Sequence, residues 1–340
     1  IIAAAISARF LHKNEGIESS DVFDLLKKLS KKPIKNYAGK TGKYITAEYD
    51  SPNKNPKIKD LVKIYISLSD VNMTALLNPN NSHILQEYVD ASVAYVNTDN
   101  VNKWSIVLYE NNRFDTIEII SDGLGGQTKT KVDVHVKVTD DKGKLVPVNI
   151  NLSLKAGDVK QFGQVSGAEF EKQVELWNKL VGYGDLISSL ETKYDSLMFT
   201  KKKPGDAVQL VFDKISSLMN NAFKKDPKEI IKKLSEGLKY FGTLNEENVT
   251  LLQLEGGKAT VYKFDDIYNR IKNIKFQAEV TMGKGDDDEG GLPSLIISSN
   301  GKKFLKVRCR KQIKPDGSPY IRNYIEKESL FTELLSTTYQ

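Results

Sequence analysis

Two short apolar stretches each carry a charged side chain of a type that can act on a phosphodiester bond. Asp133 lies within TKVDVHVKV, and Lys155 ends VNINLSLK, with Ser153 two residues before it. A carboxylate can hold a divalent cation that polarises the scissile phosphate, and a nearby lysine can orient or activate the attacking water and offset charge in the transition state. This combination therefore indicates metal-dependent phosphodiester hydrolysis.

The two stretches are short and rich in β-branched residues, which predicts neighbouring strands joined by a turn. Residues two apart on a strand share a face, so Ser153 should point the same way as Lys155, and Asp133 the same way as Lys131 and His135. A polar face within apolar strands favours a functional site. The structural alternative makes Asp133 a solvated residue on an edge strand and Lys155 a lysine that extends to solvent from a strand end.

These positions resemble the signature of the PD-(D/E)XK nuclease superfamily, which has an acid on one strand and an acid-x-Lys triplet on the next. The triplet here is Ser153-Leu154-Lys155, and the proline and the second acid of the signature are missing. A restriction-endonuclease subgroup of this superfamily has Ser-x-Lys and carries its glutamate on the following helix, about fourteen residues beyond the lysine. Glu169 lies at that offset, with Glu171 in reserve, and a strand end, a loop and one helical turn would return it to the strand ends.

The resemblance covers residues 82–195 and implies a restriction-endonuclease-like fold. It implies that Asp133 and Glu169 ligate Mg²⁺, which Mn²⁺ can replace. It also implies that Lys155 acts on the water nucleophile or the phosphate and that Ser153 supports the site.

Two further features of the superfamily have matches in this chain. Members often contribute a glutamate from the helix before the sheet, and Glu87 is the best-placed acid for a second metal ion, with Asp90 as its competitor. Many members also carry a glutamine motif after the lysine, whose amides contact the site or the DNA backbone. Gln161 and Gln164 in KQFGQ resemble that motif.

A second group of cations lies near the C-terminal end of the sequence. In KKFLKVRCRKQ, basic residues alternate with apolar ones, which predicts a strand with one basic and one buried face. The return segment SPYIRNYIEK adds Arg322 between Tyr320 and Tyr324 on one face, so this hairpin is suited to nucleic acid, although basic strand faces are also commonly just solvated. The residues expected to contact nucleic acid are Gln161, Gln164, Lys129, Lys306, Arg308, Arg310 and Arg322.

Two other motifs resemble ligand-binding loops only in part. The glycine-rich stretch at residues 123–130, which contains Lys129, resembles a phosphate-binding loop, but the glycine before the lysine is absent and a strand is expected where a helix should begin. It is expected to form a tight connection beside the active site. The acidic run at residues 285–291 lacks the spacing of an EF-hand loop and is expected to be a solvated turn.

Composition narrows the class of protein. The chain has 340 residues, 39% apolar residues and a net charge of +6, and no 18-residue apolar run that would span a bilayer. Its one cysteine, Cys309, rules out an intramolecular disulfide and a cysteine-based zinc or iron–sulfur site. The three histidines lie far apart, so carboxylates must hold any metal. We expect a cytoplasmic protein of bacterial or phage type, whose apolar start at residues 1–10 belongs to the fold rather than to a signal peptide.

The expected fold class is α/β or α+β, with a mixed central sheet flanked by helices. Helices are expected at residues 2–32, 58–68, 82–96, 168–195, 207–223 and 227–241, a basic loop at 31–57, and strands at 104–108, 115–120, 131–138, 146–154 and within 249–324. The expected domains are a helical N-terminal region (1–80), a nuclease core (81–199) and a C-terminal α+β domain for DNA recognition or dimerisation (200–340).

The leading hypothesis is a metal-dependent DNA endonuclease, restriction-like or homing-like, that makes sequence-specific double-strand cuts. A symmetric double-strand cut needs two active sites, which favours a homodimer. The serine in place of the acid supports an alternative, a nucleic-acid-binding protein that has lost hydrolysis. A third hypothesis keeps the nuclease but changes its substrate to RNA or single-stranded DNA.

Overall fold

The chain folds into two compact units in the computed structural model. Unit 1 comprises residues 1–159, 246–262 and 337–340, and unit 2 comprises residues 160–245 and 263–336. The structure describes residues 1–12, 16–31, 34–35, 44–50, 61–67, 78, 80, 82–98, 101, 114–121, 131–140, 144–246, 249–283, 292–314 and 316–340. These units differ from the expected segments 1–80, 81–199 and 200–340, because the chain returns to the sheet of unit 1 after residue 246.

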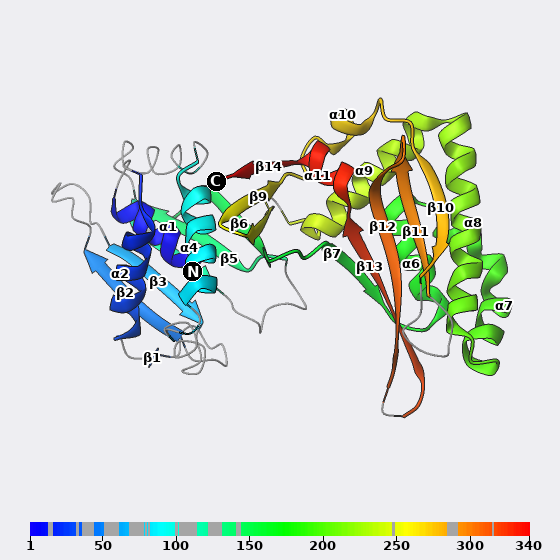
Figure 1. Cartoon of the computed structure of the whole chain (residues 1–340), viewed down its shortest axis with the longest axis horizontal. Helices are drawn as coiled ribbons and strands as arrows, with labels where there is room; N and C mark the ends of the chain where they lie inside the picture. The colour runs from blue at the N-terminus through cyan, green and yellow to red at the C-terminus, as the bar shows by residue number, and fades with distance from the viewer. Residues whose placement is uncertain are drawn as a thin grey trace. The chain divides into compact units, whose positions relative to one another are not determined.

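A mixed sheet forms the centre of unit 1 (Figure 1). Its described strands follow the order β1-β2-β3-β4-β5-β6-β8-β9-β14. The pairs β3–β4 and β6–β8 are parallel, whereas β4–β5 and β5–β6 are antiparallel. The strands are β1 (Ile34–Lys35), β2 (Tyr44–Asp50), β3 (Leu61–Ser67), β4 (Phe114–Ser121), β5 (Val134–Asp140), β6 (Leu145–Ala156), β8 (Val249–Glu255), β9 (Lys258–Tyr262) and β14 (Ser336–Tyr339).

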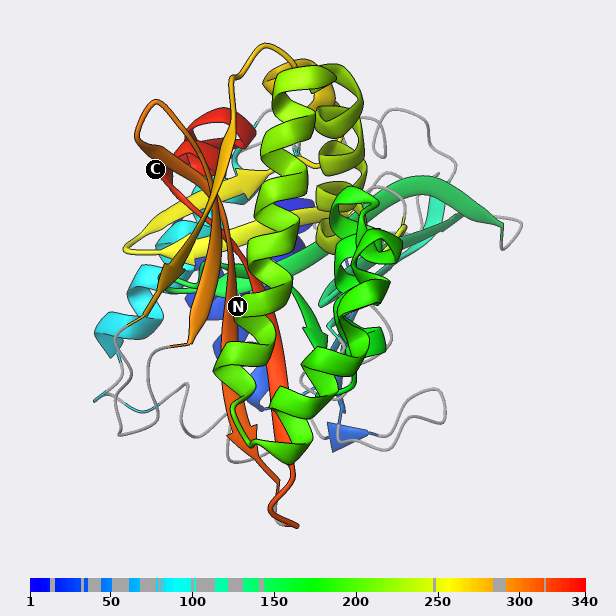
Figure 2. The ribbon, with the colours of Figure 1, turned by 90° about the vertical axis from the view of Figure 1, so that its right-hand side faces the viewer.

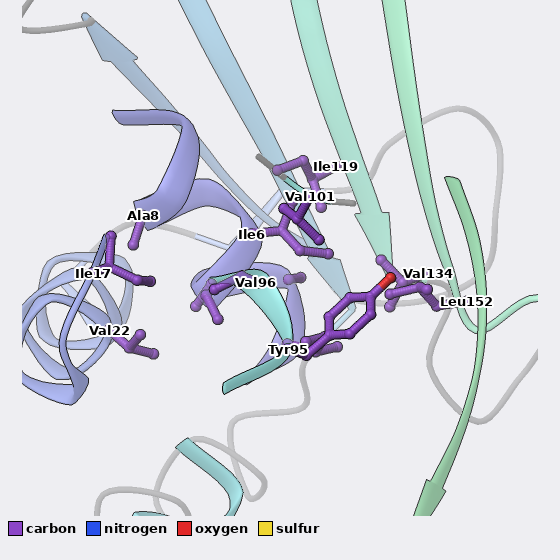
Figure 3. Close-up of a cluster of buried hydrophobic side chains, with 14 of the residues drawn as sticks. Ile6, Ala8, Ile17, Val22, Tyr95, Val96, Val101, Ile119, Val134 and Leu152 are labelled. Carbon is purple, nitrogen blue, oxygen red and sulfur yellow. The ribbon is translucent and has the colours of Figure 1, made fainter. Parts of the chain in front are cut away.

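Helices α1 (Ile2–Leu11), α2 (Ser19–Ser30) and α4 (Ser82–Val96) pack with this sheet around one hydrophobic core. The core includes Ile6 of α1 and Tyr95 of α4, and Val134 of β5 and Leu152 of β6 lie close to them (Figure 3). Because side chains alternate along a strand, the neighbouring residues of β5 and β6 point to the opposite face of the sheet. That face carries the polar residues predicted from the sequence.

Unit 2 contains an antiparallel sheet with the strand order β10-β11-β12-β13-β7. The strands are β7 (Gln161–Ser166), β10 (Gln277–Met282), β11 (Pro293–Ser299), β12 (Lys302–Ile313) and β13 (Pro319–Lys327). The helical elements are α6 (Phe170–Val181), η3 (Gly184–Leu190), α7 (Glu191–Asp195), η4 (Ser196–Thr200), α8 (Pro204–Lys225), α9 (Pro227–Thr243), α10 (Ile267–Ile271) and α11 (Ser329–Leu335). Helix α8 runs along one side of the sheet (Figures 1 and 2).

Polar and small residues fix the helices of unit 2 in place. Ser216 and Asn220 of α8 both donate hydrogen bonds to the carbonyl of Ala278 on β10, at 2.9 and 2.7 Å. At the contact of α6 with α9, a Cβ atom on Gly237 would lie 2.2 Å from the carbonyl oxygen of Leu180, so only glycine permits this approach. These contacts attach α8 to the sheet of unit 2 and pack α6 closely against α9.

The expected elements are confirmed in most of the described chain. A mixed sheet flanked by helices is present, and the helix at residues 82–96 and the strands near 115–120 and 146–154 form where expected. The helix expected at residues 58–68 is wrong, because Leu61–Ser67 forms strand β3 between β2 and β4. The loop expected at 31–57 is also wrong where β1 and β2 form. The strand expected at 104–108 lies outside the described residues.

No helix in the described part of the chain is long and apolar enough to cross a membrane.

Candidate functional site

Asp133 is fixed against strand β6 by two main-chain hydrogen bonds. Its N–H donates to the carbonyl of Leu152 at 2.7 Å, and the N–H of Leu154 donates to its carboxylate Oδ2 at 2.6 Å. The sequence predicted Asp133 in the middle of a strand, but the residue immediately precedes β5. The carboxylate is therefore tied to the main chain of β6 at the residue between Ser153 and Lys155. Hydrogen bonds to an ionised carboxylate are among the stronger ones in proteins.

The residues around this carboxylate share the face of the sheet that lies opposite the α1–α4 core. His135 and Asn151 are paired directly across β5 and β6, and His135 Nδ1 lies 3.2 Å from Asn151 Oδ1. Ser153 follows on the same face and is buried, with 2% of its surface exposed. Lys155, two residues further on, is partly exposed. The predicted shared face of Ser153 and Lys155 is thus consistent with the alternation along β6.

Four charged groups, Lys131, Asp133, Lys155 and Glu246, interact around this point, and we call them the charge cluster. Burial and, to a smaller extent, the positive charge of Lys155 lower the pKa of Lys131 to about 8, although the carboxylates of Asp133 and Glu246 act in the opposite direction. The N–H of Lys131 also donates to Glu246 Oε2 at 3.2 Å. The cluster therefore brings two carboxylates and two ammonium groups into electrostatic contact within unit 1.

Strand β8 supports the lysine end of the site. It runs parallel to β6, and Gln253 lies opposite Lys155. The buried Gln253 amide donates to the carbonyl of Gly157 at 2.7 Å, and its oxygen accepts from the Tyr262 hydroxyl at 3.3 Å. Sequence reasoning missed Gln253 and Glu246, because a pairing between residues 98 positions apart leaves no local pattern. The only signal was a glutamine within the apolar stretch VTLLQLE.

The predicted acids Glu169 and Glu171 belong to unit 2, whereas Asp133 and Lys155 belong to unit 1. Glu169 is the N-cap residue of α6, and both glutamates are exposed. The expected path from Lys155 to Glu169 through a loop alone is wrong, because strand β7 forms between them and joins the second sheet. The role of Glu169 as a metal ligand stays a prediction.

The upstream acids lie on helix α4. Glu87 is exposed there, and its metal-binding role also stays a prediction. Asp90 accepts hydrogen bonds from Ser19 at 2.5 Å and from Gln86 at 2.7 Å, which gives it a structural role between α2 and α4.

The carboxylates of the charge cluster are the groups that could hold a metal ion at this site. Among the described residues, no group of three or more histidine, cysteine, aspartate or glutamate side chains gathers around one point. Mg²⁺ is commonly held by one or two carboxylates, with waters and substrate phosphates completing its shell. Asp133 can provide one such carboxylate, and Glu246 is the other acid of the charge cluster.

A second polar surface lies on the sheet of unit 2, and we call it the polar sheet face. Strand register aligns its residues in three rows across β7, β13 and β12. Alternate residues such as Val307, Cys309 and Ile321 are buried on the opposite side. The rows are Ser166, Arg322 and Arg310; Gln164, Tyr324 and Arg308; and Gln161, Glu326 and Lys306.

The polar sheet face is internally organised. The side chains of Gln161, Gln164 and Ser166 form a hydrogen-bonded chain along β7, with distances of 3.1 and 2.6 Å. Arg308 donates from Nε to Glu326 Oε1 at 2.9 Å, and its guanidinium lies 5.2 Å from the centre of the Tyr324 ring. These contacts preorganise amide and guanidinium groups, which lowers the cost of binding a ligand.

The structure places six of the seven predicted nucleic-acid contacts on this one face, Gln161 and Gln164 included. The sequence had assigned the glutamines to the nuclease core and the arginines to a separate domain, and the pairing of β7 with β13 joins them. Lys129 lies outside the described residues, as do the neighbouring glycine-rich stretch and the whole acidic run at 285–291.

No protein-family model and no curated protein matches the chain. Among solved structures, restriction endonuclease MspI in complex with its cognate DNA is similar over 65% of this chain and 97% of that chain, with 13% sequence identity and a TM-score of 0.29. A TM-score of this size carries no conclusion about fold or function. The case for a functional site therefore rests on the residues of this chain.

Proposed function

We propose that this protein is a metal-dependent endonuclease that hydrolyses phosphodiester bonds in DNA. The observation that carries the proposal is the hydrogen bond from the Leu154 N–H to the Asp133 carboxylate. It ties an acid at the start of one strand to the main chain of the next, one residue from Lys155. An acid and a lysine held this way supply the two charges that phosphodiester hydrolysis needs.

Each residue then has a defined task. Asp133 holds a divalent ion, which supplies Lewis-acid polarisation of the phosphate when it is bound. Lys155 orients the attacking water or a phosphate oxygen and offsets the negative charge that builds up in the transition state. Ser153, which is buried on β6 two residues before Lys155, supports the site. Gln253 and Tyr262 hold the strand ends on the far side of Lys155.

The second carboxylate has two candidates. Glu169 is the acid that the superfamily resemblance selects, and Glu246 is the acid that shares the charge cluster with Asp133. Both can be replaced by glutamine, which keeps the side-chain shape and removes the charge. We propose that one of the two completes the metal site.

The polar sheet face supports DNA as the substrate, because its arginines and lysine match a phosphate backbone. We further propose sequence-specific double-strand cleavage of the restriction or homing kind by a homodimer, since each strand of a symmetric site needs its own active site.

The test is incubation of the purified protein with supercoiled plasmid in Mg²⁺, Mn²⁺, Ca²⁺ or EDTA. We expect cleavage in Mg²⁺ or Mn²⁺, none in EDTA and none by Asp133→Ala. Of Glu169→Gln and Glu246→Gln, the variant that loses cleavage identifies the second carboxylate. Plasmid left intact by the wild-type protein in every metal would overturn the proposal.

A specific observation favours one other function. Ser153 occupies the position of the superfamily acid and is only 2% exposed, so the triplet itself offers no charged metal ligand. A DNA-binding protein without hydrolysis accounts for this arrangement. Metal-independent binding of DNA in a gel shift, without cleavage under any condition, would select this second function.

A further inference from the structure

The hairpin of β12 and β13 extends beyond the rest of its sheet. The pairing of β12 with β11 ends at Arg308, and the pairing of β13 with β7 ends at Arg322. From Cys309 to Ile313 and back from Pro319 to Ile321, the two strands continue as a pair, and this extension is visible at the bottom of Figure 1. A two-stranded ribbon of this kind fits the major groove of B-form DNA, which is about 12 Å wide.

Arginine is concentrated at the base of this ribbon. The sequence contains six arginines, and three of them, Arg308, Arg310 and Arg322, lie on the polar sheet face. The other basic residues of the chain are overwhelmingly lysine. Arginine differs from lysine in its planar fork of donors, which recognises guanine O6 and N7 in a bidentate way. The placement therefore matches base recognition better than general attraction to phosphate.

This placement of arginines brings two like charges together in the free protein. Arg310 and Arg322 lie directly opposite each other on β12 and β13, and like charges at such a pair destabilise a sheet. Arg310 is exposed, and the buried Nε of Arg322 has no hydrogen-bond partner among the described residues. Lys314 adds a third positive charge near the same ring as Arg322, that of Tyr320, at 5.4 Å from its centre. A polyanionic ligand removes this repulsion.

Arg308, the neighbouring arginine on the polar sheet face, already has a partner within the protein. Arg308 is bound to Glu326, whose side chain is 10% exposed, so its charge is already compensated within the protein. It therefore acts as a positioning residue that stiffens the ribbon base. Arg310, on the next row, keeps its guanidinium exposed to a ligand.

We propose that the ribbon enters the major groove of duplex DNA and that Arg310 recognises a guanine there, with Arg322 beside it and the amides of Gln161 and Gln164 contacting the flanking bases or backbone. This inference rests on the proposed DNA substrate and adds the element that selects its sequence. The side chains of this face are complementary to base edges in a duplex. They combine planar guanidinium groups with amides that can both donate and accept hydrogen bonds, and tyrosine rings lie beside the guanidinium groups.

The experiment selects bound sequences from a pool of randomised duplexes about three helical turns long, in EDTA so that no cleavage occurs. Wild-type protein should enrich a motif that contains a guanine, and replacement of guanine by 7-deazaguanine should weaken binding of that motif roughly tenfold. Arg310→Gln should lose the preference at one G·C position, lower affinity for the motif roughly tenfold, and leave the thermal unfolding temperature unchanged or raised. The control Arg270→Gln, an exposed arginine on α10 whose guanidinium bonds to the Leu334 carbonyl, should keep both motif and affinity.

The outcomes separate this inference from the proposed function. Cleavage of plasmid in Mg²⁺ by an Arg310→Gln protein that enriches the wild-type motif would overturn the inference and leave the nuclease standing. A motif that depends on Arg310, with no cleavage by wild type, would support the inference and overturn the nuclease. Enrichment of no motif by the wild-type protein would also overturn the inference.

Discussion

At the scale of single residues, Asp133 has two roles that substitution can separate. Its carboxylate accepts the Leu154 N–H, which is a structural task, and its negative charge is available for a cation, which is the proposed catalytic task. Lys131 lies in the same charge cluster, so the charge of Asp133 also offsets that of Lys131. A purely structural aspartate would need only an acceptor oxygen at this position.

We predict that Asp133→Asn folds with nearly wild-type stability and lacks cleavage, because an amide oxygen can still accept the Leu154 N–H but carries no charge for a metal. Asp133→Ala loses the acceptor as well, and its free energy of unfolding should fall by about 1–3 kcal/mol. Urea denaturation and plasmid cleavage of both variants provide the measurements. Full cleavage by Asp133→Asn would show that the charge is not used.

At the scale of elements, the site is built from the β5–β6 pair, and the sequence predicted this pair well. Alternation of Val134, Val136 and Leu152 with polar residues identified both strands and their polar face. The same local reasoning was wrong for residues 61–67, where spacing typical of a helix belongs to a strand between two partners. Pairing with β2 and β4 makes these residues a strand, and such pairing cannot be recognised from the local sequence.

Contacts over long separations explain what the sequence did not predict. Glu246 and Gln253 reach the site because β8 pairs with β6 at a sequence separation of 98 residues. The glutamines of β7 reach the arginines of β13 across about 160 residues. No spacing rule connects such positions. The residues at the strand ends could be predicted, and their partners from distant strands could not.

The Arg308–Glu326 contact at the base of the ribbon should stabilise unit 2. The Glu326 side chain is only 10% exposed, so this ion pair is partly shielded from water. Removal of the carboxylate leaves the Arg308 guanidinium without its partner in this partly buried position. We predict that Glu326→Ala lowers the free energy of unfolding by roughly 2 kcal/mol in urea denaturation. The matched control is Glu333→Ala, whose ion pair with Lys302 is more than half exposed and should contribute under about 1 kcal/mol. Equal losses in the two variants would show that burial of this pair is unimportant.

At the scale of the whole molecule, buried tyrosines and the cysteine should make the fold sensitive to alkali. Burial raises the pKa of Tyr95 and of Tyr194 and raises the pKa of Cys309 to about 12. Above about pH 9 the unfolded chain loses these protons while the folded chain keeps them, so stability should fall as pH rises. Lys131, with its lowered pKa, acts in the opposite direction between about pH 8 and 10.5.

A comparison with Tyr194→Phe isolates one of these groups, because Lys131 contributes equally to both proteins. We predict that the stability difference between wild type and Tyr194→Phe shrinks as pH rises from about 9 to 11, since only the wild type loses the neutral-tyrosine contribution. Urea denaturation at several pH values measures this difference. A difference that stays constant over the range would show that Tyr194 ionises normally in the folded protein.

We propose that the two units have separate tasks, with hydrolysis in unit 1 and DNA recognition in unit 2. The central claim is that Lys155 acts in phosphodiester hydrolysis. Lys137 offers a matched control, because it is an exposed lysine on the neighbouring strand β5. Each substitution removes one positive charge from the same sheet, so an effect of net charge alone would be equal in the two variants.

The most direct measurement is therefore the rate of DNA cleavage in Mg²⁺ by Lys155→Ala and Lys137→Ala, with DNA binding of both measured in EDTA. We predict that Lys155→Ala cleaves at least about 100-fold more slowly than wild type while still binding DNA, and that Lys137→Ala cleaves at nearly the wild-type rate. Cleavage by Lys155→Ala at the wild-type rate would contradict the account.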